Sequence, residues 1–367
     1  MRIGIDARMA GETGIGRYVT RLVEELALMR PSGFEFVLFE RNPAAGRFAA
    51  TGFSSIAAPP RWYSVQEQVQ MPGIFRRARL DLVHVPHWNV PLLPLGAPFV
   101  VTIHDLILLT HPSRRATVGG PLRYAVKNAA YRRVLAHALG ASRKIIAVSE
   151  TTAVDIRRHD PSVADKVVAI PLGGPELAAR SVLQIPSPAG RYLLYVGNAY
   201  PHKDVETLLV AVAALRAMPE FGDLRLIWIG QDDVFSRRVR ASDAWHALAA
   251  AADWRGPVAD TELAAAYRGA QALVTATRAE GFGLTPLEAL AFGTPVIVTD
   301  IPVHHEVLGD AARYVPPGDA KGFAAAVAAL LRDPKARAVA APPRFSWRRM
   351  AEQTLAVYAS SVPHPHG

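Results

Sequence analysis

The chain has 367 residues, of which half are hydrophobic and a fifth are charged, so it can build two globular domains and is neither disordered nor fibrous. It contains no cysteine, which excludes a disulfide framework, a thiolate nucleophile and a cysteine-ligated metal site. No apolar run reaches the length of about 18 residues that a membrane span needs, and no signal-peptide pattern opens the sequence, so we expect a cytoplasmic protein.

The net charge of +9 lies in the first half of the chain. Residues 1–175 hold 22 Lys and Arg against 13 Asp and Glu, whereas residues 176–367 hold 19 of each kind. This asymmetry indicates an anionic partner, such as a lipid head group or a phosphate-bearing acceptor, although a solvated basic surface would give the same pattern. Peripheral contact with the inner face of an anionic membrane would fit, with Arg123 and Lys127 on one helix face. Nucleic acid is disfavoured because none of its common binding signatures is present.

Short apolar segments alternate with segments of helical periodicity through the first half. The predicted strands cover residues 3–7, 34–40, 81–85, 99–105 and 144–149. Alternation of this kind is typical of a parallel sheet flanked by helices. We therefore predict an α/β domain over residues 1–175.

Two segments of this domain carry candidate ligand-binding residues. Gly14 and Gly16 stand in a loop before a helix predicted to begin near Arg17, so a flexible backbone and an anion-friendly helix start face the ligand. His104 and Asp105 end the fourth predicted strand, at the sheet edge where active residues gather. A strand-end histidine often has a structural role, and Asp105 would orient His104 or cap the next turn.

Histidines also stand at and after the end of the third predicted strand, where His84 and His87 would border a ligand pocket. Together with His104 and His111 they do not form a spaced ligand set, and no Asp-x-Asp motif is present to bring a divalent ion to a diphosphate. We therefore expect no metal and no other cofactor.

The alternation of strands and helices repeats in the second half. The predicted strands cover residues 191–197, 224–230, 271–277, 294–300 and 312–316. A second α/β domain is expected over residues 190–346, after a linker rich in Gly and Pro near residues 172–190. The final helix, about residues 347–360, is expected to pack back on the first domain. The predicted fold class is therefore α/β, with two doubly wound, Rossmann-like domains facing a central cleft.

The segment ATRAEGFGLTPLEALAFGTPVIVTD, residues 276–300, is the most informative. Gly281 and Gly283 predict a turn that leads into a helix capped by Thr285. A glycine loop that feeds a helix start presents backbone N–H groups and a helix dipole to phosphate. Thr285 and Glu288 also match a capping box, so a purely structural role for Glu288 stays open.

Glu280 and Glu288 enclose the seven residues GFGLTPL. This pattern strongly resembles the nucleotide-sugar motif of the retaining glycosyltransferases of family 4, which have the GT-B fold. The resemblance implies that Glu280 contacts hexose hydroxyls of the donor and that Glu288 binds the ribose. The residues whose backbone it implies to face the sugar and phosphate are Gly281, Phe282, Gly283, Leu284 and Thr285.

Other segments resemble the same family in the same order. YVGNAYPHKDVETLLVA, residues 195–211, resembles the family's segment with a basic residue for the donor diphosphate, which makes Lys203 the candidate. Asn198 stands where many members have Arg, and we expect it beside the same diphosphate. WRGPVADTELAAAYRGA resembles the segment that lies against the nucleotide base, near Gly256 and Val258.

In the first domain, the segments DARMAGETGIGRYVTRLVEEL and VVTIHDL resemble the mannosyltransferase-like members. This likeness implies that the Gly14 and Gly16 loop approaches the donor phosphate and the acceptor, and that His104 contacts the donor sugar. The residues assigned to catalysis are then His104, Glu280 and Lys203. The residues assigned to the acceptor are Arg17, His84, His87 and Asp105.

The resemblance implies an enzyme that transfers a hexose with retention, with mannose from GDP-mannose the favoured donor. The acceptor would be a glycan or lipid-linked oligosaccharide in the synthesis of a cell-surface polysaccharide such as lipopolysaccharide. Lys203 and the helix and loop amides would stabilise the leaving diphosphate without a metal. Two alternatives stay open: a nucleotide-sugar epimerase of similar build, and a non-catalytic protein that binds a nucleotide-sugar or a glycan.

Overall fold

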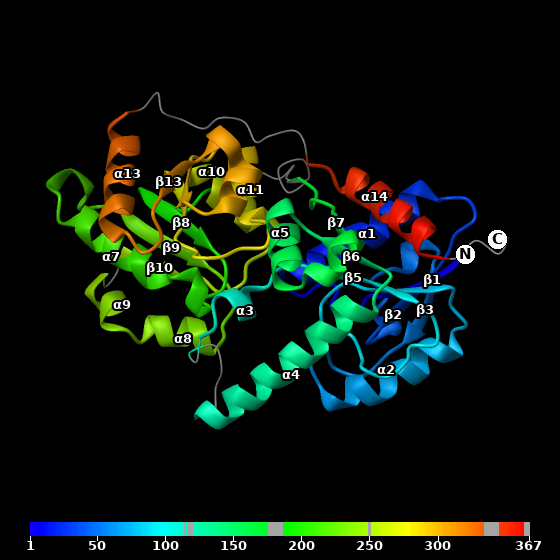
Figure 1. The fold of residues 1–367 in the computed structure, drawn as a ribbon. Coiled ribbons are helices and arrows are strands. Elements are labelled where there is room, and N and C mark those ends of the chain that lie inside the picture. Colours follow the sequence, from blue (N-terminus) through cyan, green and yellow to red (C-terminus); the bar gives the residue numbers. More distant parts are fainter. Residues whose placement is uncertain (114, 116–119, 175–185, 249–250, 334–344, 363–367) are drawn as a thin grey trace. The chain divides into compact units, whose positions relative to one another are not determined.

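The computed structural model describes residues 1–113, 115, 120–174, 186–248, 251–333 and 345–362. The chain divides into two compact units (Figure 1). Unit 1 comprises Met1–Leu106, Thr117–Gly173 and Phe345–Gly367, and unit 2 comprises Ile107–Ala116 and Gly174–Arg344. Most of the predicted linker lies outside the described residues. The segment Ile107–Ala116, which the sequence division put in the first domain, groups with unit 2, where Arg115 pairs with Glu206 at 2.7 Å.

Unit 1 is built on a parallel sheet of seven strands among the described residues. Its strands, in spatial order, are β3 (Ser54–Ala57), β2 (Glu35–Glu40), β1 (Arg2–Asp6), β4 (Leu82–Val85), β5 (Phe99–Ile103), β6 (Lys144–Ala147) and β7 (Val167–Ala169). The inner strands β4 and β5 are mostly apolar and buried at every residue, because helices cover both faces of such a sheet. The order reverses between β1 and β4, and ligands of open α/β sheets bind at that point, beyond the carboxyl ends of the strands.

The longer helices of unit 1 are α1 (Thr13–Met29), α2 (Val65–Arg77), α4 (Gly120–Ala141), α5 (Glu150–His159) and α14 (Trp347–Ser361). Helix α14 comes from the end of the chain and packs against α1, as Figure 1 shows in red and blue. Gly173 allows the close approach of its first residue, since a Cβ at this glycine would lie 2.2 Å from the ring of Trp347.

A buried polar chain connects α14 to the sheet of unit 1. Tyr358 Oη lies 2.7 Å from His84 Nδ1, and His84 Nε2 lies 2.8 Å from Thr102 Oγ1, which is 3.0 Å from Tyr18 Oη. Both ring nitrogens of His84 are therefore engaged, and the side chain is fully buried. The structure gives His84 this structural role in place of the predicted contact with an acceptor.

Unit 2 has a six-stranded parallel sheet within its described residues. In spatial order its strands are β10 (Ala252–Trp254), β9 (Arg225–Ile229), β8 (Tyr192–Val196), β11 (Ala272–Thr275), β12 (Val296–Thr299) and β13 (Arg313–Val315). Its α-helices are α3 (Ile107–Thr110), α7 (Val205–Arg216), α8 (Val234–Arg240), α9 (Asp243–Leu248), α10 (Asp260–Gly269), α11 (Leu284–Ala291), α12 (Pro302–Leu308) and α13 (Ala320–Arg332). Here the strand order reverses between β8 and β11.

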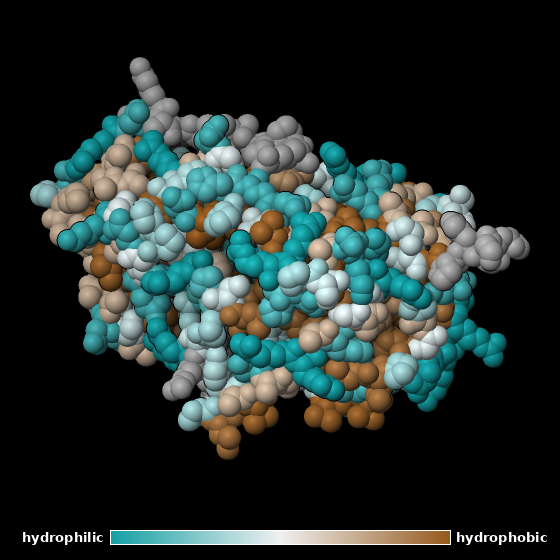
Figure 2. All heavy atoms as spheres, viewed as in Figure 1, coloured by the Kyte–Doolittle hydropathy of each residue, from teal (hydrophilic) through white to brown (hydrophobic). Residues whose placement is uncertain are grey.

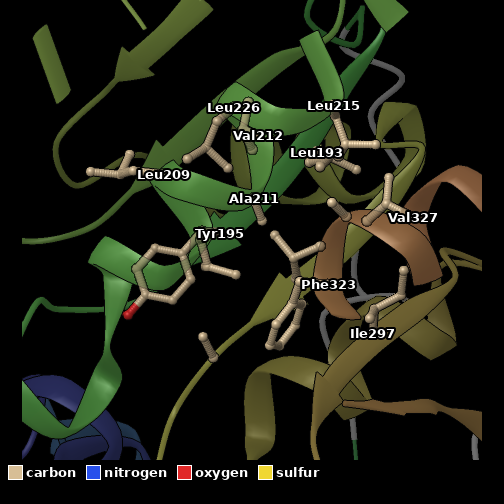
Figure 3. Close-up of a cluster of buried hydrophobic side chains, with 14 of the residues drawn as sticks. Leu193, Tyr195, Leu209, Ala211, Val212, Leu215, Leu226, Ile297, Phe323 and Val327 are labelled. Atoms are coloured by element: carbon tan, nitrogen blue, oxygen red, sulfur yellow. The ribbon is translucent and has the colours of Figure 1, made fainter. Parts of the chain in front are cut away.

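The main core of unit 2 lies where α7 and α13 cover the sheet. Leu209 and Val212 of α7 and Phe323 and Val327 of α13 are buried together with strand residues such as Leu193 (Figure 3). Burial of each of these large side chains contributes about 1.5 to 3 kcal/mol. This packing fixes the strands whose carboxyl ends carry the candidate site.

The predicted fold class is confirmed, because both units are α/β with parallel, doubly wound sheets. All ten predicted strands are present, within three residues of their predicted ends. The sequence analysis missed β3, β7 and β10, each of which lies at the edge of a sheet. The described helices are each too short or too polar to cross a bilayer.

Candidate active site

Lys203 and Glu280 meet at the carboxyl ends of neighbouring strands of unit 2. Lys203 follows β8 and Glu280 follows β11, on the two sides of the point where the strand order reverses. The Lys203 ammonium donates to Glu280 Oε2 in a direct ion pair. Burial would raise the pKa of Glu280, but Lys203 outweighs it and holds this pKa below its usual range. Lys203, which is predicted to bind the diphosphate, and Glu280, which is predicted to bind the hexose, thus lie together with opposite charges.

The two loops that carry this pair are braced against each other. The N–H of Arg278 donates to the carbonyl of His202 at 2.7 Å, and the Arg278 guanidinium pairs with Asp204 at 2.8 Å. Thr277 Oγ1 donates to Ala279 O at 2.7 Å within the loop. These bonds hold the two loops together and so preorganise the site.

Helix α11 begins earlier than predicted. Its N-cap is Gly283, whose φ of 91° is favourable only for glycine, and the first helical residue is Leu284. Thr285 therefore lies within the first turn, and the predicted capping box with Glu288 is wrong. The first N–H groups of a helix have no partner within it, so the start of α11 offers donors to an anion beside Glu280.

Glu288 is buried in the interior of unit 2. Its Oε2 accepts a hydrogen bond from Tyr267 Oη at 2.9 Å, and the residue is only 6% exposed. The aromatic ring of Tyr267 stacks on Phe292 at the end of α11. Tyr267 thus fixes one carboxylate oxygen of Glu288, and the predicted ribose contact depends on the other.

The remaining predicted donor residues lie on two separate loops. Asn198 follows β8, and its carbonyl accepts from Tyr195 Oη at 2.5 Å. Gly256 has a positive φ of 65° and accepts from the N–H of Gly230 at 3.2 Å, which connects the ends of β9 and β10. Val258 is partly buried two residues further on.

In unit 1, the predicted loop at Gly14 and Gly16 is the first turn of α1. The helix begins at Thr13 rather than near Arg17, with Glu12 as its N-cap. A Cβ on Gly16 would lie 2.5 Å from the carbonyl oxygen of Met9, so glycine is required there by close backbone packing. A Cβ on Gly14 would meet nothing within 4 Å.

His104 directly follows β5 and is held in one orientation. Its Nε2 donates to Pro86 O at 2.9 Å, and its ring meets that of Tyr18 edge-on at 5.1 Å between centroids. Burial lowers the pKa of His104 to about 4, so the imidazole is neutral at pH 7. Asp105 is partly exposed beside it.

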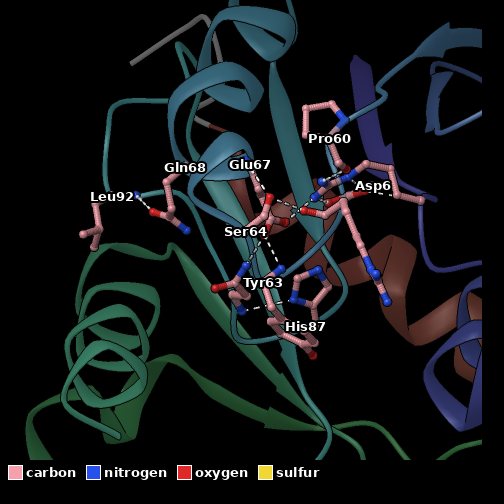
Figure 4. Close-up of polar contacts among 11 residues, drawn as sticks. Asp6, Pro60, Tyr63, Ser64, Glu67, Gln68, His87 and Leu92 are labelled. Carbon is pink, nitrogen blue, oxygen red and sulfur yellow. Dashed lines mark hydrogen bonds and ion pairs between the residues drawn. The ribbon is translucent and has the colours of Figure 1, made fainter. Parts of the chain in front are cut away.

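A cluster of charged groups that the sequence analysis did not find fills the carboxyl end of β1 (Figure 4). The Arg8 guanidinium lies 2.6 Å from Asp6 Oδ2 and 2.5 Å from Glu67 Oε1, and Asn89 donates to the other oxygen of Glu67. His87 is buried within this cluster and not at a surface, and its Nδ1 accepts from the N–H of Asn89 at 3.1 Å. Atoms of Asp6, Glu67 and His87 lie within 4.8 Å of one another, but Arg8 already supplies the cation.

This cluster makes the stability of unit 1 depend on pH. Burial raises the pKa of Glu67 to about 7, against the opposing effect of Arg8. A carboxyl whose pKa is raised on folding contributes stability below its unfolded pKa and loses it as the pH rises through the folded pKa. We therefore expect the free energy of unfolding of Glu67→Gln, relative to the native protein, to rise by about 2 to 3 kcal/mol between about pH 5 and pH 8.

Urea unfolding of both proteins across this pH range measures the effect. The buried His84 and His104 act in the opposite direction, since burial lowers their pKa values to about 3 and about 4, but they are common to both proteins and cancel. A difference that is constant with pH would mean that Glu67 ionises equally in the folded and unfolded chains.

Comparison with known proteins connects both units to one family. The model for Glycosyltransferase Family 4 matches residues 13–173, and the model for Glycosyl transferases group 1 matches residues 190–333. A glycogen synthase of Mycobacterium tuberculosis is 30% identical over 79% of this chain and 71% of that relative. The chain belongs to the family 4 glycosyltransferases.

Further relatives extend this likeness over almost the whole glycosyltransferase. The O-antigen chain mannosyltransferase B of Escherichia coli is 27% identical over 94% of this chain and 96% of that protein. Among solved structures, Anabaena HepE in complex with UDP and glucose superposes with a TM-score of 0.70 at 15% identity, over 98% of this chain and 99% of that one. WaaG, involved in lipopolysaccharide biosynthesis, gives 0.66 at 16% identity over the full length of both chains. The fold is therefore GT-B.

Lys203 provides a direct test of the predicted donor site of this glycosyltransferase. A hydrogen bond that involves a charged group contributes about 1.5 to 3 kcal/mol, so Lys203→Gln should weaken the binding of a nucleoside diphosphate about 10- to 100-fold. Isothermal titration with GDP and UDP measures the effect. Lys321→Gln, which removes an exposed lysine of α13, is the matched control and should change nothing. Equal affinities in the two variants would contradict the assignment.

Proposed function

We propose that this glycosyltransferase transfers a hexose from a nucleotide-sugar to a glycan or a lipid-linked acceptor, with retention of configuration. The observation that carries the proposal is the Lys203–Glu280 pair beside the start of α11. Lys203 and the helix amides match the charge of a diphosphate, and Glu280 matches the hydroxyl donors of a sugar. A diphosphate that attracts Lys203 would release Glu280 for the hexose.

In the proposed reaction, the bond between the anomeric carbon and the diphosphate oxygen breaks while the acceptor oxygen bonds to the same face of that carbon. The proton of the acceptor hydroxyl passes to the departing phosphate oxygen, so no carboxylate acts as a nucleophile. Lys203 and the amides at the start of α11 stabilise the charge of the leaving group, without a metal in this proposal. Glu280 and the neutral His104 position the hexose.

Mannose from GDP-mannose is the proposed donor sugar, in the synthesis of a cell-surface polysaccharide. Support comes from relatives named as mannosyltransferases, among them the O-antigen enzyme of Escherichia coli and a phosphatidyl-myo-inositol mannosyltransferase of Mycolicibacterium smegmatis, 34% identical over 46% of this chain and 45% of that relative. The structural likeness to HepE, which has been solved in complex with UDP-glucose, makes UDP-glucose the competing donor to test.

A thermal-shift panel of GDP-mannose, UDP-glucose, dTDP- and ADP-sugars without added metal tests the donor, because a ligand that binds only the folded state raises the Tm. A shift with GDP-mannose alone would support mannose, and a shift with UDP-glucose alone would overturn it. Release of free nucleoside diphosphate only when an acceptor is added would support transfer over epimerisation. No shift with any of them would contradict the proposed function.

We also propose that unit 1 contacts an anionic membrane through α4. The buried residues of this helix all lie from Tyr131 onward, whereas Leu122 and Val126, one turn apart, are 79% and 63% exposed. Arg123 and Lys127 flank them, and an apolar row bordered by cations suits an anionic bilayer surface. Figure 2 shows hydrophobic residues gathered at its lower edge, where Figure 1 places α4 and α2.

Flotation with lipid vesicles measures this contact. The native protein should float with vesicles that contain phosphatidylglycerol and not with vesicles of phosphatidylcholine alone, and Leu122→Gln/Val126→Gln should reduce its floating fraction severalfold. Val154→Gln, on the exposed face of α5, is the control and should leave flotation unchanged. Equal flotation of the double variant would contradict the role of α4.

A further inference from the structure

His304 carries a buried nitrogen that has no hydrogen-bond partner among the residues the structure describes. The residue lies on α12, next to the carboxyl end of β12, and is 1% exposed. Its Nδ1 lies 2.7 Å from the carbonyl oxygen of Thr299. Because a carbonyl oxygen only accepts, Nδ1 carries the ring proton, and Nε2 of the neutral ring is left with a lone pair. Nε2 finds no hydrogen-bond partner in the described part of the chain.

Such a group needs an explanation, because a buried acceptor without a donor costs about 1 to 3 kcal/mol. Burial lowers the pKa of His304, so the ring cannot relieve the cost by taking up a proton near neutral pH. Nε2 therefore needs a hydrogen-bond donor that the described residues do not supply.

The free edge of this ring faces the gap at Gly283. A Cβ built on Gly283 would lie 3.8 Å from His304 Cδ2, the carbon bonded to Nε2, and 3.9 Å from Glu280 Cγ. These are ordinary van der Waals distances, so the missing side chain of Gly283 leaves room for about one methyl group between Glu280 and His304. Glu280 also forms the ion pair with Lys203, so this space adjoins the residue that is predicted to bind the diphosphate.

We infer that His304 is a sugar-specificity residue, whose Nε2 accepts a hydrogen bond from one hexose hydroxyl of the donor beside Glu280. This inference rests on the proposed function and deepens it. A phosphate oxygen is itself an acceptor and does not satisfy the lone pair, whereas a sugar hydroxyl does. When the diphosphate draws Lys203 from Glu280, the Glu280 carboxylate accepts from a neighbouring hydroxyl of the same hexose.

Two substitutions at this position separate recognition from structure. The amide of His304→Asn lies near the place of Nδ1 and can keep the bond to Thr299, but it does not reach the place of Nε2. The amide of His304→Gln reaches that place and can again accept. His305→Asn is the matched control, because this neighbouring ring is 52% exposed and bonds to Asp300.

Isothermal titration with GDP-mannose and with GDP, and in parallel with UDP-glucose and UDP, measures the contribution of the sugar. His304→Asn should bind the accepted sugar nucleotide about tenfold more weakly and the free nucleoside diphosphate with unchanged affinity. His304→Gln should recover most of the loss, and His305→Asn should match the native protein.

Equal binding of the sugar nucleotide by the native protein and His304→Asn would overturn the inference, as would an equal loss for sugar nucleotide and free diphosphate. The second result would mean that His304 only supports the loop. If the native protein bound none of the four ligands, the proposed function and this inference would both fail. Binding of GDP or UDP with no change in His304→Asn would leave the proposed function in place and reject the inference alone.

Discussion

Replacing Glu280 by alanine is expected to lower hexose transfer by about 100-fold or more, because a loss of substrate alignment on the order of 1 Å costs about that factor. The Glu280 carboxylate pairs with Lys203 and is the proposed acceptor of hydrogen bonds from hexose hydroxyls. Alanine removes this acceptor. Binding of the free nucleoside diphosphate should persist, since Lys203 is then released from its partner. The measurement is the rate at which the enzyme releases nucleoside diphosphate from the sugar nucleotide after a fraction of lipid-linked acceptors is added.

Two further variants give this result its meaning. Glu280→Gln keeps the shape of the side chain but removes its charge, so it should retain more activity than alanine. Glu262→Gln, on the exposed side of α10, should behave as the native protein. If Glu280→Ala transferred the hexose at the native rate, the assignment of Glu280 to the site would be wrong. If the variant lost nucleotide binding as well as transfer, the substitution would have damaged the loop.

Arg8→Met is expected to destabilise unit 1 by about 3 to 5 kcal/mol, the usual cost of leaving a buried charge without its partner. Arg8 is 4% exposed and neutralises both Asp6 and Glu67, which are buried as well. Because a protein of two units need not unfold in one step, the quantity to follow is the urea midpoint of the transition that this variant shifts.

Arg2, the first residue of β1, offers a matched control. It pairs with Glu35 at the surface, and exposed pairs contribute about 0 to 1 kcal/mol, so Arg2→Met should barely move the midpoint. In the triple variant Asp6→Asn/Arg8→Met/Glu67→Gln the buried charges are gone, and most of the lost stability should return. If Arg8→Met were as stable as Arg2→Met, the buried network would not be stabilising.

The inner strands could be predicted from the sequence, because apolar runs are typical of strands that are buried on both faces. It failed at β3, the segment Ser54–Ala57, since an edge strand needs no such run and its residues are largely exposed. It also misplaced the start of α11, because Thr285 looks like a good cap and only the backbone shows that Gly283 takes that position at positive φ.

The candidate site divides in the same way. The pairing of Lys203 and Glu280 could be predicted, since each follows a strand and parallel strands bring their carboxyl ends together. The cluster around Arg8 could not, because Arg8 and Glu67 are 59 residues apart and no local pattern joins them. The buried Nε2 of His304 could not be predicted either, because its lack of a partner depends on which ring nitrogen bonds to the carbonyl of Thr299.

The place of α14 in unit 1 constrains how the chain can fold as it is synthesised. Tyr358 and its neighbours complete the interior of a unit whose first strand begins at Arg2, so these surfaces of unit 1 stay uncovered until α14 has been synthesised. All residues of unit 2 have left the ribosome before α14 emerges. Unit 2 can therefore reach its native form before unit 1 is complete, and a chain truncated before Trp347 would expose apolar surface of α1 and β5.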